Sequence, residues 1–176
     1  MIALVVAVLC GIGGISKFAS EGAEEPVGNS SPAWMSGGLT YTLVDSSNAM
    51  PCSAHAYGAV LDFLASQPCN ALNRALFEAS DDGGHQMLVA VSWTDMPTVE
   101  TAVQLQQKID RSGNGNITEL SKESNKYPGV PFTGKHYAST VNDRTTVVAQ
   151  AEPLLKAPSA DLLKNTAKLA LSAARP

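Results

Sequence analysis

The feature that most constrains the fold is the run Met87–Trp93 (MLVAVSW), which is apolar at nearly every position. The run is too short for a typical helix, and it lacks the alternation of a strand with one solvent-exposed face. It therefore predicts a central strand that is covered on both faces. The chain has 176 residues, of which 44% are hydrophobic, so it is long enough to bury such a strand within one domain.

Other segments predict the remaining strands. Alternating residues mark Leu39–Val44 as the first strand. His136–Val141 and Thr145–Ala151 flank Asn142-Asp143, a kind of dipeptide that is common in tight hairpin turns. Asp81-Asp82-Gly83-Gly84 predicts a turn just before the central strand.

Helical spacing predicts helices between these strands. Ser53 caps a helix that Pro68 ends, and a short helical segment follows around Leu72–Phe77. Pro97 begins a helix that runs to Ile109, and Ser159 caps a last helix. Because strands and helices interleave irregularly, we predict an α+β fold. It comprises a small, mostly antiparallel sheet with helices packed on one face, ferredoxin-like in spirit, preceded by an N-terminal apolar helix.

The amino-terminal run Ile2–Ile15 (IALVVAVLCGIGGI) is apolar or small throughout. A membrane span needs about 20 residues, so the run fits either a signal-peptide core or a span that extends to Ala19. A membrane anchor, a signal peptide cleaved near Ser20 and a lipoprotein signal at Cys10 all remain open. We favour the anchor.

The residues after this run indicate where the rest of the chain lies. Glutamates at positions 21, 24 and 25 follow it without a basic cluster, which is compatible with a non-cytoplasmic side. Gly, Pro and Ser are then spaced as in a linker, in which Trp34 and Met35 either lie at the bilayer interface or dock on the domain. We divide the chain into a membrane anchor or signal segment (1–18), a flexible linker (19–38) and an extracytoplasmic α+β domain (39–176).

Cys52 and Cys69 invite a disulfide in an oxidising compartment. A straight helix from Ser53 to Ser66 would be about 21 Å long, and the chain could not then return to bring the Cα atoms within about 7 Å. The disulfide, which we predict, therefore requires a shorter helix near His55–Leu64. The alternative is a zinc site of Cys52, His55 and Cys69, which offers too few ligands.

The segment Asp110–Ser121 resembles a calcium loop of the EF-hand type. Oxygen-bearing residues occupy loop positions 1, 3, 5 and 9, and Gly115 occupies position 6. However, Ser121 stands at position 12, where EF-hand proteins place a bidentate Glu. The other interpretation is a helix that Gly113 ends, followed by a turn. We predict no metal ligands, and we keep calcium-dependent binding through the Asp110 loop as an alternative function.

His55, His85 and His136 are the candidates for acid–base chemistry. His85 follows a typical turn sequence, and His136 opens a strand, where packing is the commoner role. No nucleophile elbow, phosphate-binding loop or dinucleotide motif accompanies them. We therefore predict no catalytic residues and no cofactor. A small extracytoplasmic hydrolase that uses one of these histidines is the other alternative function.

Several motifs occur together between about residues 51 and 153. They are Pro68-Cys69-x-x-Leu72-x-Arg74-x-Leu76, Val89-x-Val91-x-Trp93 with Met96-Pro97, Gly115-Asn116, Phe132-Thr133-Gly134-Lys135-His136-Tyr137 and Val147-Val148-Ala149-Gln150-Ala151-Glu152. In these motifs the chain resembles a group of uncharacterised single-pass or secreted envelope proteins of high-GC actinobacteria. The resemblance implies an envelope location, and it implies no activity or site residues. At the level of fold alone, the pattern is also similar to sporulation-related peptidoglycan-binding domains.

These observations predict a non-catalytic, membrane-tethered interaction or accessory domain of the bacterial cell envelope. Its expected partners are the membrane, through the N-terminal segment, and another envelope protein or a wall polymer. The net charge of −4 argues against a nucleic-acid partner, which a basic surface would serve. We expect the protein at the cell membrane with its domain on the extracytoplasmic side, or secreted if the N-terminal segment is cleaved.

Overall fold

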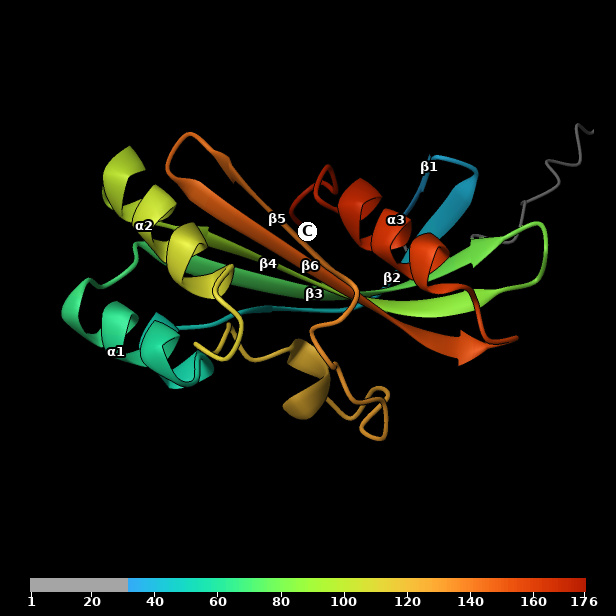
Figure 1. Ribbon diagram of the computed structural model, residues 1–176, viewed down its shortest axis with the longest axis horizontal. Helices are drawn as coiled ribbons and strands as arrows, with labels where there is room; N and C mark the ends of the chain where they lie inside the picture. Colours follow the sequence, from blue (N-terminus) through green and yellow to red (C-terminus); the bar gives the residue numbers. More distant parts are fainter. Residues whose placement is uncertain (1–31) are drawn as a thin grey trace, which may run out of the picture.

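The computed structural model describes residues 32–176, where six antiparallel strands form one curled sheet in the order β1-β2-β3-β4-β6-β5 (Figure 1). The strands are β1 (Ala33–Ser36), β2 (Leu39–Asn48), β3 (Ala71–Asp81), β4 (Gln86–Asp95), β5 (Tyr137–Asn142) and β6 (Thr145–Leu155). The helices are α1 (Ala59–Ser66), α2 (Val99–Ile109) and α3 (Ala160–Ala170), with short 3-10 turns η1 (Cys52–His55) and η2 (Leu120–Lys122). The fold is α+β with an antiparallel sheet, as predicted.

The predicted N-terminal apolar helix and the anchor segment lie outside the described residues. Among residues 32–176, no helix combines the length and the apolar character that crossing a membrane requires.

β4 confirms the prediction of a central strand covered on both faces. Every residue from Met87 to Thr94 is buried, and β4 pairs with β3 on one side and β6 on the other. The two predicted turns are also present: residues 82–85 join β3 to β4, and β5 and β6 are joined by Asp143-Arg144, one residue later than the predicted Asn142-Asp143. Ser159 caps α3 as predicted, accepting a hydrogen bond from the Leu162 N–H at 3.1 Å.

Helices cover both faces of the sheet, so the prediction of helices on one face is wrong. Side chains alternate between faces along β6. Ala149 packs against Leu163 of α3 in one core cluster. On the other face, Val148 joins a second cluster, and the Thr146 hydroxyl donates to the Ala102 carbonyl of α2 at 2.9 Å. Because β4 is apolar on both faces, each face needs a cover, and Figure 1 shows α1 and α2 at one end of the strands and α3 over the other.

β3 occupies the segment that we predicted to be helical, so that prediction is wrong. Leu72 and Leu76 are both buried on the same face of β3, while Phe77 is buried on the opposite face. A strand that is covered on both faces carries apolar residues without a two-residue period, and here their spacing mimics that of a helix.

The folded domain begins before residue 39. β1 pairs with β2 so that Trp34 lies opposite Tyr41, and the two rings stack with their centroids 4.4 Å apart. Gly37 and Gly38, both at positive φ, form the tight turn between these strands. Trp34 therefore docks on the domain, whereas Met35 is exposed. In the segment that we assigned to the linker, residues 33–36 form an edge strand of the sheet and residues 37–38 form its turn.

The helix after Ser53 is short, as the disulfide requires. Gly58, at φ 64°, separates η1 from α1, which begins only at Ala59. The chain then returns after α1 to place the Cα atom of Cys69 at 6.2 Å from that of Cys52, and the two residues form a disulfide. The predicted disulfide is confirmed, whereas the helix runs over Ala59–Ser66 instead of near His55–Leu64 and follows Gly58, so Ser53 does not cap it.

Candidate functional site

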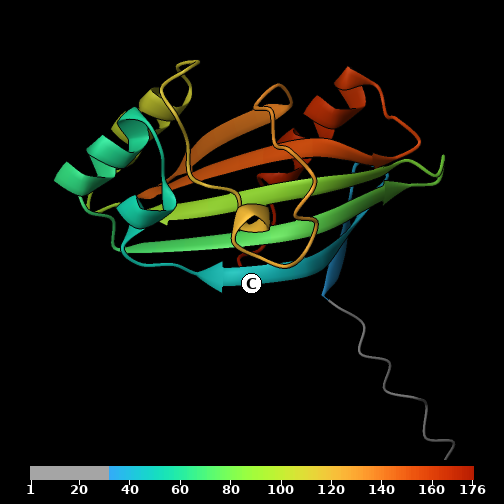
Figure 2. The ribbon, with the colours of Figure 1, turned by 90° about the horizontal axis from the view of Figure 1, so that it is seen from below.

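Two irregular segments lie between α2 and β5. The Asp110 loop (residues 110–117) follows α2, and the strap (residues 118–136) crosses the sheet before β5 begins (Figures 1 and 2, yellow to gold). Both segments line a groove of about 320 Å³. This volume lies at the lower end of the range of about 300–1,000 Å³ for ligand sites. A larger hollow of about 660 Å³ is lined by exposed residues of α2 alone. Because several separate segments converge on the groove, we take it as the candidate site.

The first wall of the groove is the Asp110 loop, which packs tightly against the segment after η1. A Cβ atom on Gly115 would collide with the carbonyl oxygen of Tyr57, so this close approach requires glycine. The Tyr57 N–H donates to the Asn116 carbonyl at 3.0 Å. The Cys52–Cys69 disulfide ties the same segment to the chain before β3. This wall is therefore braced by covalent and backbone contacts.

Asp110 and Asn114, two of the oxygen-bearing residues of the Asp110 loop, are engaged in hydrogen bonds within the protein. The Asp110 carboxylate accepts hydrogen bonds from the Tyr137 hydroxyl and, at 2.7 Å, from the Ser139 hydroxyl. The Asn114 side-chain amide donates to the Lys108 carbonyl at 3.2 Å, in the last turn of α2. Within the described residues, no group of three His, Cys, Asp or Glu side chains is arranged to hold a metal ion.

The second wall is the end of the strap, which Glu152 holds. This carboxylate is only 6% exposed, and it accepts hydrogen bonds from both the N–H and the hydroxyl of Thr133 at 2.7 Å. Phe132 and Tyr137 line the groove on either side of this anchor. The wall therefore depends on a buried carboxylate of β6.

The floor of the groove is the amide of Gln150 on β6, which is 4% exposed. Its side-chain N–H donates to Glu119 at 2.8 Å, and the second Glu119 oxygen lies 2.9 Å from the Lys122 ammonium group. That ammonium group also lies 5.3 Å from the centre of the Tyr57 ring. A buried carboxylate beneath the floor is thus paired, and the surface above it is an uncharged amide.

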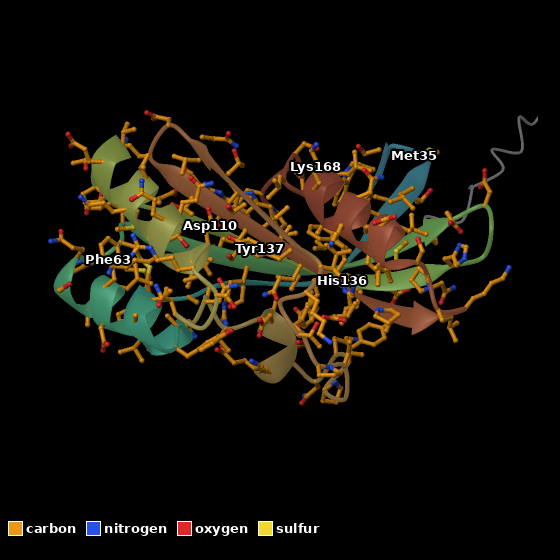
Figure 3. All side chains as sticks on the ribbon, in the orientation of Figure 1. Met35, Phe63, Asp110, His136, Tyr137 and Lys168 are labelled. Carbon is orange, nitrogen blue, oxygen red and sulfur yellow. A yellow bond between two sulfur atoms is a disulfide. The ribbon has the colours of Figure 1, made fainter. Side chains whose placement is uncertain are left out.

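The groove has no excess of either charge. The charged side chains that line it are Asp110 and Arg111, one of each sign. Burial, together with the hydrogen bond to Asp110, raises the pKa of the Tyr137 phenol, and burial next to Glu119 raises that of Tyr57. Both phenols therefore keep their protons at neutral pH. Figure 3 shows Asp110 and Tyr137 beside each other between α2 and β5.

The three histidines considered for catalysis lie outside the lining of the groove. The Nδ1 atom of His55 is 3.0 Å from a Glu123 oxygen, and that of His85 is 2.8 Å from an Asp81 oxygen. The hydrogen bond from His85 holds the pKa of the Asp81 carboxyl below its usual value. The Nδ1 atom of His136 faces Glu152 at 3.7 Å. Each histidine is thus next to a carboxylate of its own rather than beside a shared cleft.

A second, more enclosed cavity lies beneath the strap. Arg74, Ser92 and Glu119 are among the residues around it, and its volume is about 10 Å³. A cavity of this size has room for about one water molecule. It is too small for an organic ligand, so the groove remains the candidate site.

Sequence reasoning missed most residues of the groove. Tyr57, Asn116, Phe132 and Gln150 come from four separate segments, and no spacing in the sequence connects them. Glycine was the available signal, because Gly115 sits in a loop where only a close backbone approach requires it.

Comparison with known proteins provides no family and no relative. No protein-family model matches the chain, and neither a curated protein nor a solved structure matches it significantly. The resemblance to actinobacterial envelope proteins gains no support from these comparisons.

Proposed function

We propose that the chain is a non-catalytic binding protein of the bacterial cell envelope, with its α+β domain outside the cytoplasm. The observation that carries this location is the Cys52–Cys69 disulfide. Disulfides persist in secreted and extracytoplasmic proteins, whereas cytosolic reductants keep thiols reduced. The apolar run Ile2–Ile15 supplies the membrane tether or export signal that such a location needs.

The groove favours binding over catalysis. Its walls are held by the disulfide region and by Glu152, so a ligand would meet a largely preformed surface. Its polar groups are amides, phenols and a balanced pair of charges. His55 and His85 are next to carboxylates away from the groove. His136 faces Glu152, the carboxylate that holds Thr133, and does not line the groove. We infer that the domain holds a wall polymer or another envelope protein in this groove and does not transform it.

The first test is a pull-down of the full-length protein from detergent-solubilised native membranes, paired with co-sedimentation on isolated cell walls. One stoichiometric membrane protein in the pull-down supports an accessory subunit, and co-sedimentation supports wall binding. Walls incubated with the protein should release no soluble fragments, and such release would instead support the hydrolase alternative.

The matched variants are Tyr57→Ala, in the groove, and Val103→Ala, on the exposed side of α2 away from it. We expect the first variant to lose its partner and the second to keep it. Absence of any partner and any wall binding, with the protein found in the cytoplasm, would contradict the proposal.

A further inference from the structure

The groove is suited to an uncharged, polyhydroxylated ligand. We propose that it binds a short saccharide segment, such as a stretch of wall glycan, and this inference rests on the proposed function above. Three properties of the groove support it: its charge balance, the kinds of side chain around it, and the way its walls are fixed.

The charge balance disfavours ionic ligands. Asp110 and Arg111 offset each other along the lining, and Glu119 beneath the floor is neutralised by Lys122. A ligand of either sign would meet a charge of its own sign next to the opposite one, so it would lose hydration in the groove for little net electrostatic gain. An uncharged ligand avoids this cost.

The side chains match the two surfaces of a sugar ring. The C–H faces of a sugar pack on aromatic rings, while its hydroxyls need planar partners that donate and accept. Tyr57, Phe132 and Tyr137 supply aromatic surface from three separate segments, and Tyr57 is 44% exposed. Asn116 and Gln150 supply amides, which both donate and accept hydrogen bonds.

The centre of the groove disfavours a protein partner. Protein interfaces have an apolar core in which large anchors are fully desolvated. Here the floor is the Gln150 amide, hydrogen-bonded to a buried carboxylate. A large apolar anchor seated on it would leave polar groups unpaired, whereas a sugar hydroxyl would bond to them.

The walls are fixed before a ligand arrives. The disulfide and the Gly115–Tyr57 contact brace one wall, and Glu152 holds Thr133 in the other. A preformed site spends less free energy on ordering its own groups, which matters for saccharides because their individual hydroxyl contacts are weak.

The test is calorimetric titration of the full-length protein in detergent with a matched pair of oligosaccharides. N-acetylated chito-oligosaccharides are uncharged, and their deacetylated counterparts are cationic at the same length. We expect saturable binding of the acetylated form and clearly weaker binding of the deacetylated form. No saturable binding of the acetylated form, or tighter binding of the cationic form, would overturn the inference.

Variants assign the binding to the groove. Tyr57→Ala should weaken it about tenfold, as expected for loss of a central aromatic anchor. Phe132→Ala, which removes aromatic surface from the other wall, should also weaken binding and provides a second groove variant in case Tyr57→Ala does not fold, and Val103→Ala is the control. Equal affinity in both groove variants and the wild type would overturn the inference.

The two proposals fail separately. If the protein sediments with walls but neither binds oligosaccharide nor responds to Tyr57→Ala, the envelope-binding function survives and the saccharide groove is overturned. If a protein partner is captured and Tyr57→Ala releases it, a polypeptide occupies the groove and the saccharide is again overturned.

Discussion

The two faces of the sheet are covered in different ways. On one face, α3 packs through Leu163, Ala167 and Ala170 into a continuous apolar cluster with Val89 and Ala149. On the middle of the other face, the strap buries a smaller apolar cluster around Leu120. Here polar contacts, rather than a large apolar cluster, hold the strap on the sheet.

Each of these polar contacts links the strap to a strand. Asp45 accepts from Ser124 at 2.5 Å, Glu78 from Tyr127, and Glu152 from Thr133. Arg74, only 2% exposed, donates to Glu123 at 2.5 and 2.8 Å. Apolar burial is insensitive to pH, whereas contacts to carboxylates hold the strap at neutral pH and weaken when the carboxylates are protonated. The α3 face therefore stabilises the fold, and the strap face positions the groove.

Leu163→Ala should have the largest effect. It removes a buried side chain from the α3 face and leaves a cavity, so we expect a loss of about 3 kcal/mol in the free energy of unfolding. Denaturant unfolding measures the loss, and hydrogen exchange should accelerate in all the long strands together. Leu155→Ala, at an exposed position, is the control. Faster exchange confined to α3 would contradict the assigned role of this face.

Removing the disulfide should cost nearly as much. Cys52 and Cys69 are 17 residues apart, and closing a loop of that length is worth about 3 kcal/mol. The double variant Cys52→Ser/Cys69→Ser should therefore lower the denaturant midpoint. Hydrogen exchange should also increase at Tyr57 and in the Asp110 loop, because the bond braces that wall of the groove. An unchanged exchange rate there would show that the wall does not depend on the bond.

Glu152→Gln should loosen the strap without loosening α3. It weakens the buried acceptor for Thr133, which we expect to cost about 1–2 kcal/mol. Hydrogen exchange should rise in residues 130–136 and stay constant in α3. Glu100→Gln, at an exposed position on α2, serves as the control. If hydrogen exchange accelerates equally in the strap and in α3, the strap does not open independently of the α3 face, which contradicts the comparison.

Acid should open the strap selectively. The Arg74 guanidinium beside Glu123, helped by His55, lowers the pKa of that carboxyl from 4.5 to about 2. The stability that ionised Glu123 contributes through Arg74 is therefore present above about pH 4.5 and is lost as the pH falls towards 2. Since Glu123 is 36% exposed, solvent screening limits it to about 1 kcal/mol. Hydrogen exchange at several pH values measures it, and Glu123→Gln should flatten the dependence at the strap. If hydrogen exchange in the strap depends on pH in the same way in that variant, groups other than Glu123 cause the acid opening.

Calcium should have the smallest effect, namely none. Asp110 already accepts hydrogen bonds from Tyr137 and Ser139, and no second carboxylate stands beside it at the usual ligand positions of the loop. Thermal unfolding in millimolar calcium and in chelator should give the same midpoint, because a ligand that binds only the native state must raise it. A raised midpoint would restore the calcium alternative.

The elements predicted best from the sequence are those that a few neighbouring residues determine, such as an apolar strand, a helix cap and a turn. Met87–Trp93 is apolar at nearly every position, Ser159 is a good cap, and Asn142-Asp143 is a good turn, so these elements were found. β3 was missed because Leu72 and Leu76 lie on one face of a strand that is buried on both faces. Arg74 made a buried strand still harder to predict, because a charged residue in this segment indicates an exposed position. Its burial depends on pairing with Glu123, which is far along the chain.

The groove was beyond prediction for a similar reason. Segment Asp110–Ser121 was interpreted as a calcium loop or a helix end, and His136 as the start of a strand, each taken separately. The groove exists because Tyr57, Thr133 and Gln150 meet through the disulfide, the Glu152 anchor and the packing of β6. Such contacts between distant segments leave no periodic pattern in the sequence.

The most direct test of the central claim, an extracytoplasmic binding domain, is thiol trapping in intact cells that make the full-length protein. Free thiols are alkylated before lysis, and the disulfide state is then determined by mass spectrometry. We predict that Cys52 and Cys69 resist alkylation until they are reduced, and that they are recovered as a linked peptide pair. If both are alkylated without prior reduction, the domain lies in a reducing compartment and the proposed location and function are contradicted.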